Sequence, residues 1–185
     1  MISTSDLKKG LTIEFEGQLC NILDWQHVKI GRGGAIVRMK LRNLRTGATV
    51  DRTCDAGDKF KRIYLDRINV TYQYQDGDQY HFMDTSTYDD VVLTEAQLGD
   101  AKDYLIDNLE LDIIRYEDEP ISVELPEKVV LRVTYTEPGF KGDTATGGSK
   151  PATTETGLVV QVPLFITNDE LIRVSTTTGA YVERA

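Results

Sequence analysis

Residues 29–45 read KIGRGGAIVRMKLRNLR, a glycine-rich turn followed by a strand in which apolar and basic residues alternate. Successive side chains of a strand point to opposite faces, so the apolar and the basic residues are expected on opposite sides. The apolar set is Val37, Met39 and Leu41, and the basic set is Arg38, Lys40 and Arg42. The segment therefore predicts a barrel strand whose outer face carries a row of cations about 7 Å apart.

This basic row has two interpretations. Its repeat is similar to the phosphate spacing of a nucleic-acid strand, so an RNA backbone can lie along it, with Lys29 and Arg45 extending the patch. Gly31, Gly33 and Gly34 allow positive φ angles and close approach by another molecule at the apex, where Arg32 offers guanidinium donors to phosphate or a base edge. The alternative is that the hairpin carries charge only to stay soluble and to protect a sheet edge.

The rest of the chain also reads mainly as strands. Short alternating segments such as LTIEFEG, NVTYQYQDG, KVVLRVTYT and GLVVQVPLFI are separated by Gly, Asp-Gly or Pro, which is typical of small barrels. One segment, TEAQLGDAKDYL (94–105), predicts a short helix that begins with a capping box formed by Thr94 and Gln97. In such a helix, Leu98, Ala101, Tyr104 and Leu105 share one face.

The charge is distributed unevenly along the 185 residues, whose net charge is −9. Division near residues 63 and 127 gives three segments: 1–63 at +5, 64–127 at −14 and 128–185 at zero. Each segment is long enough for a five- or six-stranded barrel. The overall acidity argues against a nucleic-acid partner, but the first segment is basic by itself. The middle segment is expected to present a solvated face turned away from RNA.

Several independent stretches resemble the bacterial elongation factor P family. They are HVKIGRGGAIVRMKLRNLRTG (27–47), YQYQDGDQYHFMDTSTYDDVVL (72–93), EPISVELP (119–126), KPATTETGLVVQVPLFI (150–166) and IRVSTTTGAYVER (172–184). The resemblance covers nearly the whole chain, and its motifs occur in the family's order. Initiation factor 5A of archaea and eukaryotes is a more distant relative with only two such domains.

The resemblance implies an all-β protein with three small β-barrels in an L shape: a KOW-type, SH3-like barrel (1–63) and two OB-fold domains (64–127 and 128–185), with one short helix in the middle domain. It implies a monomeric cytoplasmic factor that binds the 70S ribosome between the peptidyl and exit sites, contacts rRNA and positions peptidyl-tRNA. Its role would be to stimulate peptide-bond formation and relieve stalling at consecutive prolines. A ribosomal protein is a further partner considered for the acidic middle domain.

Arg32 occupies the position of the family's apical basic residue, which in many members carries a modification. The resemblance therefore implies contact of Arg32 with the tRNA end at the peptidyl transferase centre. Lysine-directed modification is excluded because the residue is arginine. The flanks VKI and GGA are similar to those of the lysine branch, and SGRNAA, typical of rhamnosylated members, is absent. Two states stay open: an unmodified Arg32, or an Arg32 rhamnosylated by a modifying enzyme.

The third segment adds further RNA-contact candidates through the same resemblance. Gly142, Asp143 and Thr144 belong to a loop that the family places near the exit-site codon, and Lys150 is suited to a phosphate. Tyr181 is a candidate for stacking on RNA, as aromatic residues of OB-type surfaces do. From the residues alone, a flexible loop is the preferred interpretation of the first three, and a core or edge-strand position is an equally good interpretation of Tyr181.

No catalytic, metal or cofactor site is predicted. Cys20 and Cys54 belong to no CxxC or Cys/His cluster, and the sequence lacks a phosphate-binding loop, a GxSxG motif and an apolar run long enough for a membrane span. A non-enzymatic translation factor is the first hypothesis. The alternatives are a divergent paralogue of elongation factor P, a generic RNA-binding barrel protein and, least favoured, a small-barrel enzyme.

Overall fold

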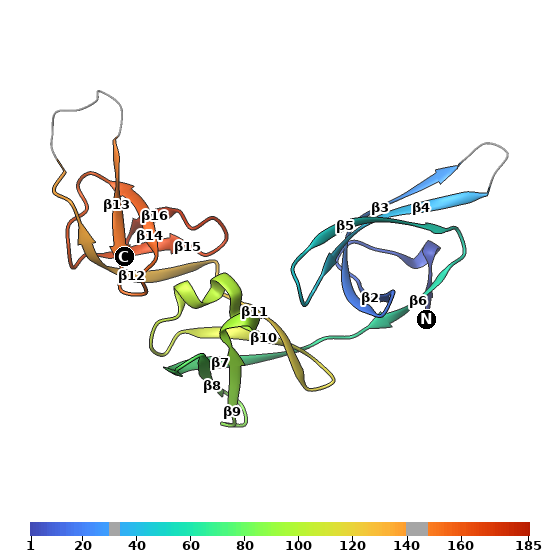
Figure 1. Cartoon of the computed structure of the whole chain (residues 1–185), viewed down its shortest axis with the longest axis horizontal. Helices are drawn as coiled ribbons and strands as arrows, with labels where there is room; N and C mark the ends of the chain where they lie inside the picture. Colours follow the sequence, from blue (N-terminus) through green and yellow to red (C-terminus); the bar gives the residue numbers. More distant parts are fainter. Residues whose placement is uncertain (30–33, 140–147) are drawn as a thin grey trace. The chain divides into compact units, whose positions relative to one another are not determined.

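The computed structural model describes residues 1–29, 34–139 and 148–185. Within these ranges the chain is built almost entirely from antiparallel strands, arranged in three curled sheets (Figure 1). The prediction of an all-β protein is confirmed. Three buried apolar clusters, one for each sheet, form its cores.

The first sheet has six strands in the order β1-β6-β2-β3-β4-β5. Their bounds are β1 (Ile2–Ser3), β2 (Thr12–Phe15), β3 (Gln18–Lys29), β4 (Ala35–Asn43), β5 (Thr49–Asp55) and β6 (Lys59–Ile63), with a 3-10 turn, η1 (Thr4–Asp6), after β1. The core is formed mainly by Leu7, Ile13, Cys20, Ile22, Val37, Met39, Leu41 and Phe60. Cys20 is a buried free thiol, and the other cysteine, Cys54, is also free.

The second sheet has five strands in the order β11-β10-β7-β8-β9. Its strands are β7 (Asp66–Asp76), β8 (Gln79–Asp84), β9 (Asp90–Thr94), β10 (Glu110–Tyr116) and β11 (Glu119–Glu124). Tyr72, Tyr80 and Phe82 pack as an aromatic group in its core. These three aromatic residues are therefore core residues on neighbouring strands, whereas Tyr74 is exposed and stacks on His81.

The predicted helix is shorter than the sequence suggested. The α-helix α1 covers only Glu95–Leu98, and the chain continues as a 3-10 turn, η2 (Gly99–Tyr104). Gly99 has φ +55° and ψ −132°, which ends the α-helical hydrogen-bonding pattern after one turn. The predicted shared face is consequently kept only in part: Leu98 and Leu105 pack in the core of the second sheet, whereas Tyr104 packs in that of the third.

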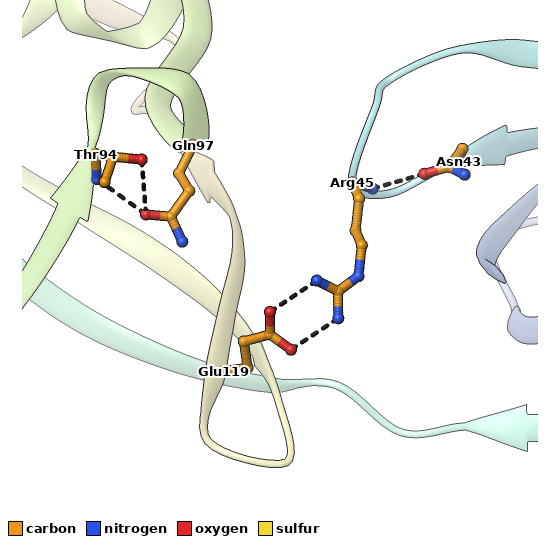
Figure 2. Close-up of polar contacts among 5 residues, drawn as sticks. All are labelled: Asn43, Arg45, Thr94, Gln97 and Glu119. Atoms are coloured by element: carbon orange, nitrogen blue, oxygen red, sulfur yellow. Dashed lines mark hydrogen bonds and ion pairs between the residues drawn. The ribbon is translucent and has the colours of Figure 1, made fainter. Parts of the chain in front are cut away.

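The start of α1 agrees with the predicted capping interaction. The side-chain oxygen of Gln97 accepts hydrogen bonds from the backbone N–H of Thr94 at 2.9 Å and from its hydroxyl at 3.1 Å (Figure 2). The backbone of Thr94 is still extended, with φ −86° and ψ 160°. These bonds fix the point at which β9 changes into the helix.

The third sheet has five strands in the order β14-β13-β12-β15-β16. They are β12 (Lys128–Thr136), β13 (Ser149–Thr154), β14 (Val159–Pro163), β15 (Leu171–Ser175) and β16 (Tyr181–Arg184). Its core contains fully buried Val, Leu and Ile side chains such as Leu131, Val162 and Ile172. Buried and exposed residues alternate along β12 and β15, as expected for strands with one face in the core and the other in solvent.

The chain divides into two compact units: residues 1–67 with 114–122, and residues 68–113 with 123–185. The first unit therefore contains the tip of the β10–β11 hairpin together with the first sheet. Ile121 from this tip is buried with Leu19 and Ile63, and Tyr116, Leu44 and Leu65 pack around them. This small apolar cluster fixes the hairpin tip against the sheet that carries the basic row.

Candidate nucleic-acid interface

The candidate interface is the outer face of β3, β4 and β5. β3 and β4 form a long antiparallel hairpin, paired from Cys20 and Asn43 up to Lys29 and Ala35 (Figure 1). β5 pairs with β4 from Thr49 to Asp55, opposite Arg42 to Ile36. The third strand β5 thus braces β4 over nearly its whole length, from Ile36 to Arg42. A three-stranded arrangement bends less than a two-stranded ribbon.

The predicted alternation along β4 is confirmed. Val37, Met39 and Leu41 are buried in the first core, while Arg38, Lys40 and Arg42 are exposed. The opposite positions on β3 and β5 decide what surrounds each of these cations, because directly paired residues of an antiparallel sheet share a face.

Two of the three cations have neutral partners directly opposite them. Arg38 lies between Gln26 and Thr53, and Arg42 lies between Asn21 and Thr49. Within residues 1–29, 34–139 and 148–185, neither guanidinium forms a hydrogen bond or ion pair. Their donors are therefore available to an external phosphate or base edge, which a guanidinium recognises through two parallel hydrogen bonds.

Lys40 is in a different environment. It lies opposite Asp24 on β3 and Asp51 on β5, so two carboxylates neighbour it on this face, although within the described residues neither forms an ion pair with its ammonium. The Asp24 carboxylate also forms an ion pair with Lys9 at 2.9 Å. The hydrogen bond from Lys9, the backbone N–H of Trp25 and the charges of Lys9 and Lys40 lower the pKa of Asp24. The row consequently consists of two exposed arginines separated by a locally neutralised lysine.

A depression of about 530 Å³ lies at this part of the sheet. It is lined by Asp24, Trp25, Gln26, Arg38, Met39, Lys40, Asp51, Arg52 and Thr53. Trp25 is half-buried, and its indole contacts the ring of His27 edge to face at a centroid distance of 5.2 Å. The depression thus combines the Arg38 guanidinium with polar groups of all three strands, a composition suited to a sugar–phosphate backbone.

Lys29 does not continue the basic row. It pairs with Ala35, which lies two residues before Val37 and therefore on the same face of β4 as the buried set. Lys29 is exposed because the end of β3 lies beyond the core. The predicted extension of the row by Lys29 is thus wrong in its geometry: this cation is on the opposite face of the hairpin.

Arg45 is engaged within the protein rather than presented to a partner. Its two terminal nitrogens donate to the two carboxylate oxygens of Glu119, each at 2.7 Å (Figure 2). The backbone N–H of Arg45 donates to Asn43 at 2.8 Å, which fixes the turn after β4. The bidentate contact lowers the pKa of Glu119 and raises that of Arg45. Nothing in the linear spacing of Arg45 and Glu119 indicated this pair, since 74 residues separate them.

Several predicted contact residues lie outside the described ranges. These are Gly31, Arg32 and Gly33 at the apex and Gly142, Asp143 and Thr144 in the third segment. Gly34 is described: it is exposed, and a side chain there would meet no atom within 4 Å, which leaves room for an approaching molecule.

Lys150 is buried, with 7% of its surface exposed, and its ammonium donates to the backbone carbonyl of Glu137 at 2.6 Å. The backbone nearby is also tightly packed, because a Cβ on Gly139 would lie 2.2 Å from the carbonyl oxygen of Leu164. Lys150 therefore ties β13 to the end of β12 in this structure, and its contact with a phosphate stays a prediction.

Tyr181 is half-buried and packs against the core of the third sheet. This position agrees with the core or edge interpretation of Tyr181, while part of the ring stays accessible.

Among the described residues, no three His, Cys, Asp or Glu side chains are grouped so that they could hold a metal ion. Over the same ranges, no helix has the length and apolar character that crossing a bilayer requires. The exposed arginines of β4 therefore stand out as candidate functional groups because of their availability rather than through any catalytic constellation.

Comparison with known proteins assigns the three sheets in turn. Residues 3–60 match the family model of the elongation factor P KOW-like domain, residues 65–123 that of its OB domain, and residues 129–184 that of its C-terminal domain. The chain belongs to the elongation factor P family. The predicted KOW-like and OB-type domains are thereby confirmed, as is the family resemblance of the separate motifs.

Full-length relatives support the same assignment. The chain is 51% identical over 185 residues to elongation factor P of Moorella thermoacetica and 50% identical over 184 residues to that of Pelotomaculum thermopropionicum, with 100% of each chain covered in both comparisons. Among solved structures, initiation factor 5A from Methanococcus jannaschii matches with a TM-score of 0.51 and 21% identity. That match covers 67% of this chain and 93% of the other, and it shows a shared fold.

Proposed function

We propose that this member of the elongation factor P family is a translation elongation factor that binds the ribosome between the peptidyl and exit sites. There it positions peptidyl-tRNA, stimulates peptide-bond formation and relieves stalling at consecutive prolines. It acts as a cytoplasmic monomer without catalytic residues of its own. The observation that carries the proposal is the pair of exposed, unpaired arginines, Arg38 and Arg42, on a hairpin braced by a third strand.

The physical basis is positioning. Proline is a constrained secondary amine and a poor participant in peptide-bond formation. When the peptidyl-tRNA end is mobile, productive geometry is rare, and a protein that holds it accelerates the step without providing a nucleophile. Each reduction of the barrier by about 1.4 kcal/mol gives a tenfold faster reaction, so a few charge-assisted contacts to phosphate are sufficient.

The proposal gives the cations different roles. Arg38 and Arg42 bind the tRNA or rRNA backbone, Lys40 contributes less because of Asp24 and Asp51, and Arg32 contacts the tRNA end. Gly142, Asp143, Thr144 and the accessible part of Tyr181 are assigned contacts with RNA in the exit site. The acidic middle segment faces away from rRNA, because like charges repel. A ribosomal protein is the proposed partner of this segment.

A reconstituted translation assay on a message with consecutive prolines tests the proposal. The wild-type chain should relieve stalling, and Arg32→Ala and the double variant Arg38→Gln/Arg42→Gln should each lose most of this activity. Arg62→Gln is a matched control, because Arg62 is an exposed arginine of the first sheet that lies on β6 rather than on the hairpin. Equal activity of all four proteins, or loss in Arg62→Gln alone, would contradict the proposal.

The state of Arg32 is a separate part of the proposal. Intact-mass measurement on the protein purified from its native host distinguishes an unmodified arginine from one that bears rhamnose. An unshifted mass removes the modifying enzyme from the set of partners. A mass increased by one deoxyhexose, localised to the peptide that contains Arg32, establishes that enzyme as a partner.

A further inference from the structure

A second candidate site lies in the other compact unit, which does not contain the basic hairpin. It is a cavity of about 730 Å³, within the size range of small-molecule sites. Its walls come from β7, β8, the α1–η2 segment and the turn after β13. The lining residues are Tyr72, Gln75, Tyr80, Glu95, Lys102, Asp103, Leu105, Ile106, Asp107, Glu155 and Thr156.

Two buried tyrosines direct unpartnered hydroxyl groups into this cavity. Tyr72 is 8% exposed and Tyr80 is 6% exposed, and both rings belong to the apolar core of the second sheet. Neither hydroxyl has a hydrogen-bond partner among the described residues. Among the same residues, Nε of Arg115 is the one side-chain nitrogen or oxygen that is both inaccessible to solvent and without a partner. Both hydroxyls therefore keep access to the outside, and the cavity that the two residues line provides it.

The charge of the walls defines the ligand class. Four carboxylates, those of Glu95, Asp103, Asp107 and Glu155, line the cavity together with one ammonium, that of Lys102. Lys102 is already ion-paired with Glu95, and Oε1 of Glu155 accepts a hydrogen bond from the backbone N–H of Arg132 at 2.9 Å, which leaves Oε2 of Glu155 for an external donor. Burial, the neighbouring Tyr80 and the charge of Asp107 raise the pKa of Tyr72, so its hydroxyl is neutral and can accept a hydrogen bond from a cation.

The carboxylates are dispersed around the wall rather than gathered at one point. Among the described residues no three acidic side chains come together as a metal site. Leu105 and Ile106 add a small apolar part to a wall that is mainly polar. Separate anionic positions connected by apolar and aromatic walls match a ligand whose positive charges are spaced along a hydrocarbon chain.

We propose that this cavity binds a linear aliphatic polyamine. Its ammonium groups are bound by Asp107, Glu155 and the hydroxyls of Tyr72 and Tyr80, and its methylene segments lie against Leu105 and Ile106. None of the residues that line this site belongs to the basic hairpin.

Isothermal titration calorimetry of the full chain with spermidine tests this inference. Wild-type protein should bind one equivalent, and butylamine, which has a single ammonium group, should bind at least about tenfold more weakly because it lacks a second charge-assisted contact. Tyr72→Phe, Tyr80→Phe and Glu155→Gln should each weaken spermidine binding by about tenfold. The Tyr→Phe changes keep the core-packing ring and remove only the hydroxyl.

Asp89→Asn is the control, since Asp89 is an exposed acidic residue of the same unit and does not line the cavity. Its affinity for spermidine should equal that of the wild type. The inference is overturned if spermidine does not bind, if Asp89→Asn weakens binding as much as Glu155→Gln, or if the two Tyr→Phe variants bind normally. Thermal unfolding of each variant, measured without ligand, identifies any loss that arises from misfolding, and a Tyr→Phe variant that keeps the wild-type melting temperature but loses binding supports the site.

Discussion

The first compact unit contains two hairpin ends that carry charge, and they use it in opposite ways. The β3–β4 hairpin exposes Arg38 and Arg42 with neutral residues directly opposite them. The β10–β11 tip uses Glu119 to engage Arg45 through two hydrogen bonds, and it buries Ile121 beside them. The first hairpin keeps its cations available, whereas the second uses a charge to attach itself to its neighbour.

This difference shows that a count of basic residues does not give the number of available cations. Besides Arg32 at the apex, which lies outside the described residues, the sequence of the hairpin and the following turn offers five candidates, Lys29, Arg38, Lys40, Arg42 and Arg45. Register places Lys29 on the other face, Lys40 between two carboxylates and Arg45 on Glu119. Two arginines are left to provide the strongest contacts with a polyanion.

The largest expected effect concerns the attachment of the second hairpin. Ile121→Ala removes buried methyl groups from the cluster with Leu19 and Ile63 and should lower the free energy of unfolding by about 2–5 kcal/mol. Urea denaturation of the full chain measures it. The control is Val92→Ala, at an exposed apolar position on β9, which should change stability by no more than about 0.5 kcal/mol. Equal effects of the two substitutions would mean that the tip contributes no buried core.

The next effect concerns the available arginines. Arg38→Gln and Arg42→Gln should each weaken binding to ribosomes that carry peptidyl-tRNA, and each should reduce the slope of log affinity against log salt by about 0.7–0.9. The double variant should show roughly the sum, because the two side chains contact separate phosphates. Affinity measured over a series of salt concentrations checks this. An unchanged slope in the double variant would show that these arginines do not neutralise phosphates.

A smaller effect is expected from the pH dependence of the Arg45–Glu119 pair. The pKa of Glu119 is lowered in the folded protein, so the pair contributes stability above the carboxyl group's unfolded pKa of about 4.3. That contribution disappears as the pH falls through the folded pKa. At neutral pH, Glu119→Gln should therefore be slightly less stable than the wild type, and the difference should vanish in acid. Urea midpoints at several pH values test this, and a difference that grows in acid would contradict it.

The smallest effect is expected for Lys40→Gln. Because Asp24 and Asp51 already balance this charge, its removal should reduce the salt-dependence slope by clearly less than Arg38→Gln does. The same ribosome-binding series measures it. A slope change equal to that of Arg38→Gln would show that the two carboxylates do not screen Lys40.

The fold could be predicted further than the site. Alternation along AIVRMKLRN is a local property, and it correctly gave the buried and exposed faces of β4. The capping interaction of Thr94 and Gln97 is equally local, but Gly99 ended the α-helix earlier than the apolar spacing indicated. The environments of Lys40 and Arg45 depend on strand register and on a residue 74 positions away, which no local pattern contains. The burial of Lys150 likewise depends on the packing of β12 beside β13.

The most direct test of the central claim is a density map of this factor on a ribosome with peptidyl-tRNA in place. We expect the guanidinium groups of Arg38 and Arg42 to lie within hydrogen-bonding distance of RNA phosphates while Arg45 stays on Glu119. A map in which the outer face of β4 points into solvent, with Arg45 released from Glu119 and bound to RNA, would contradict it.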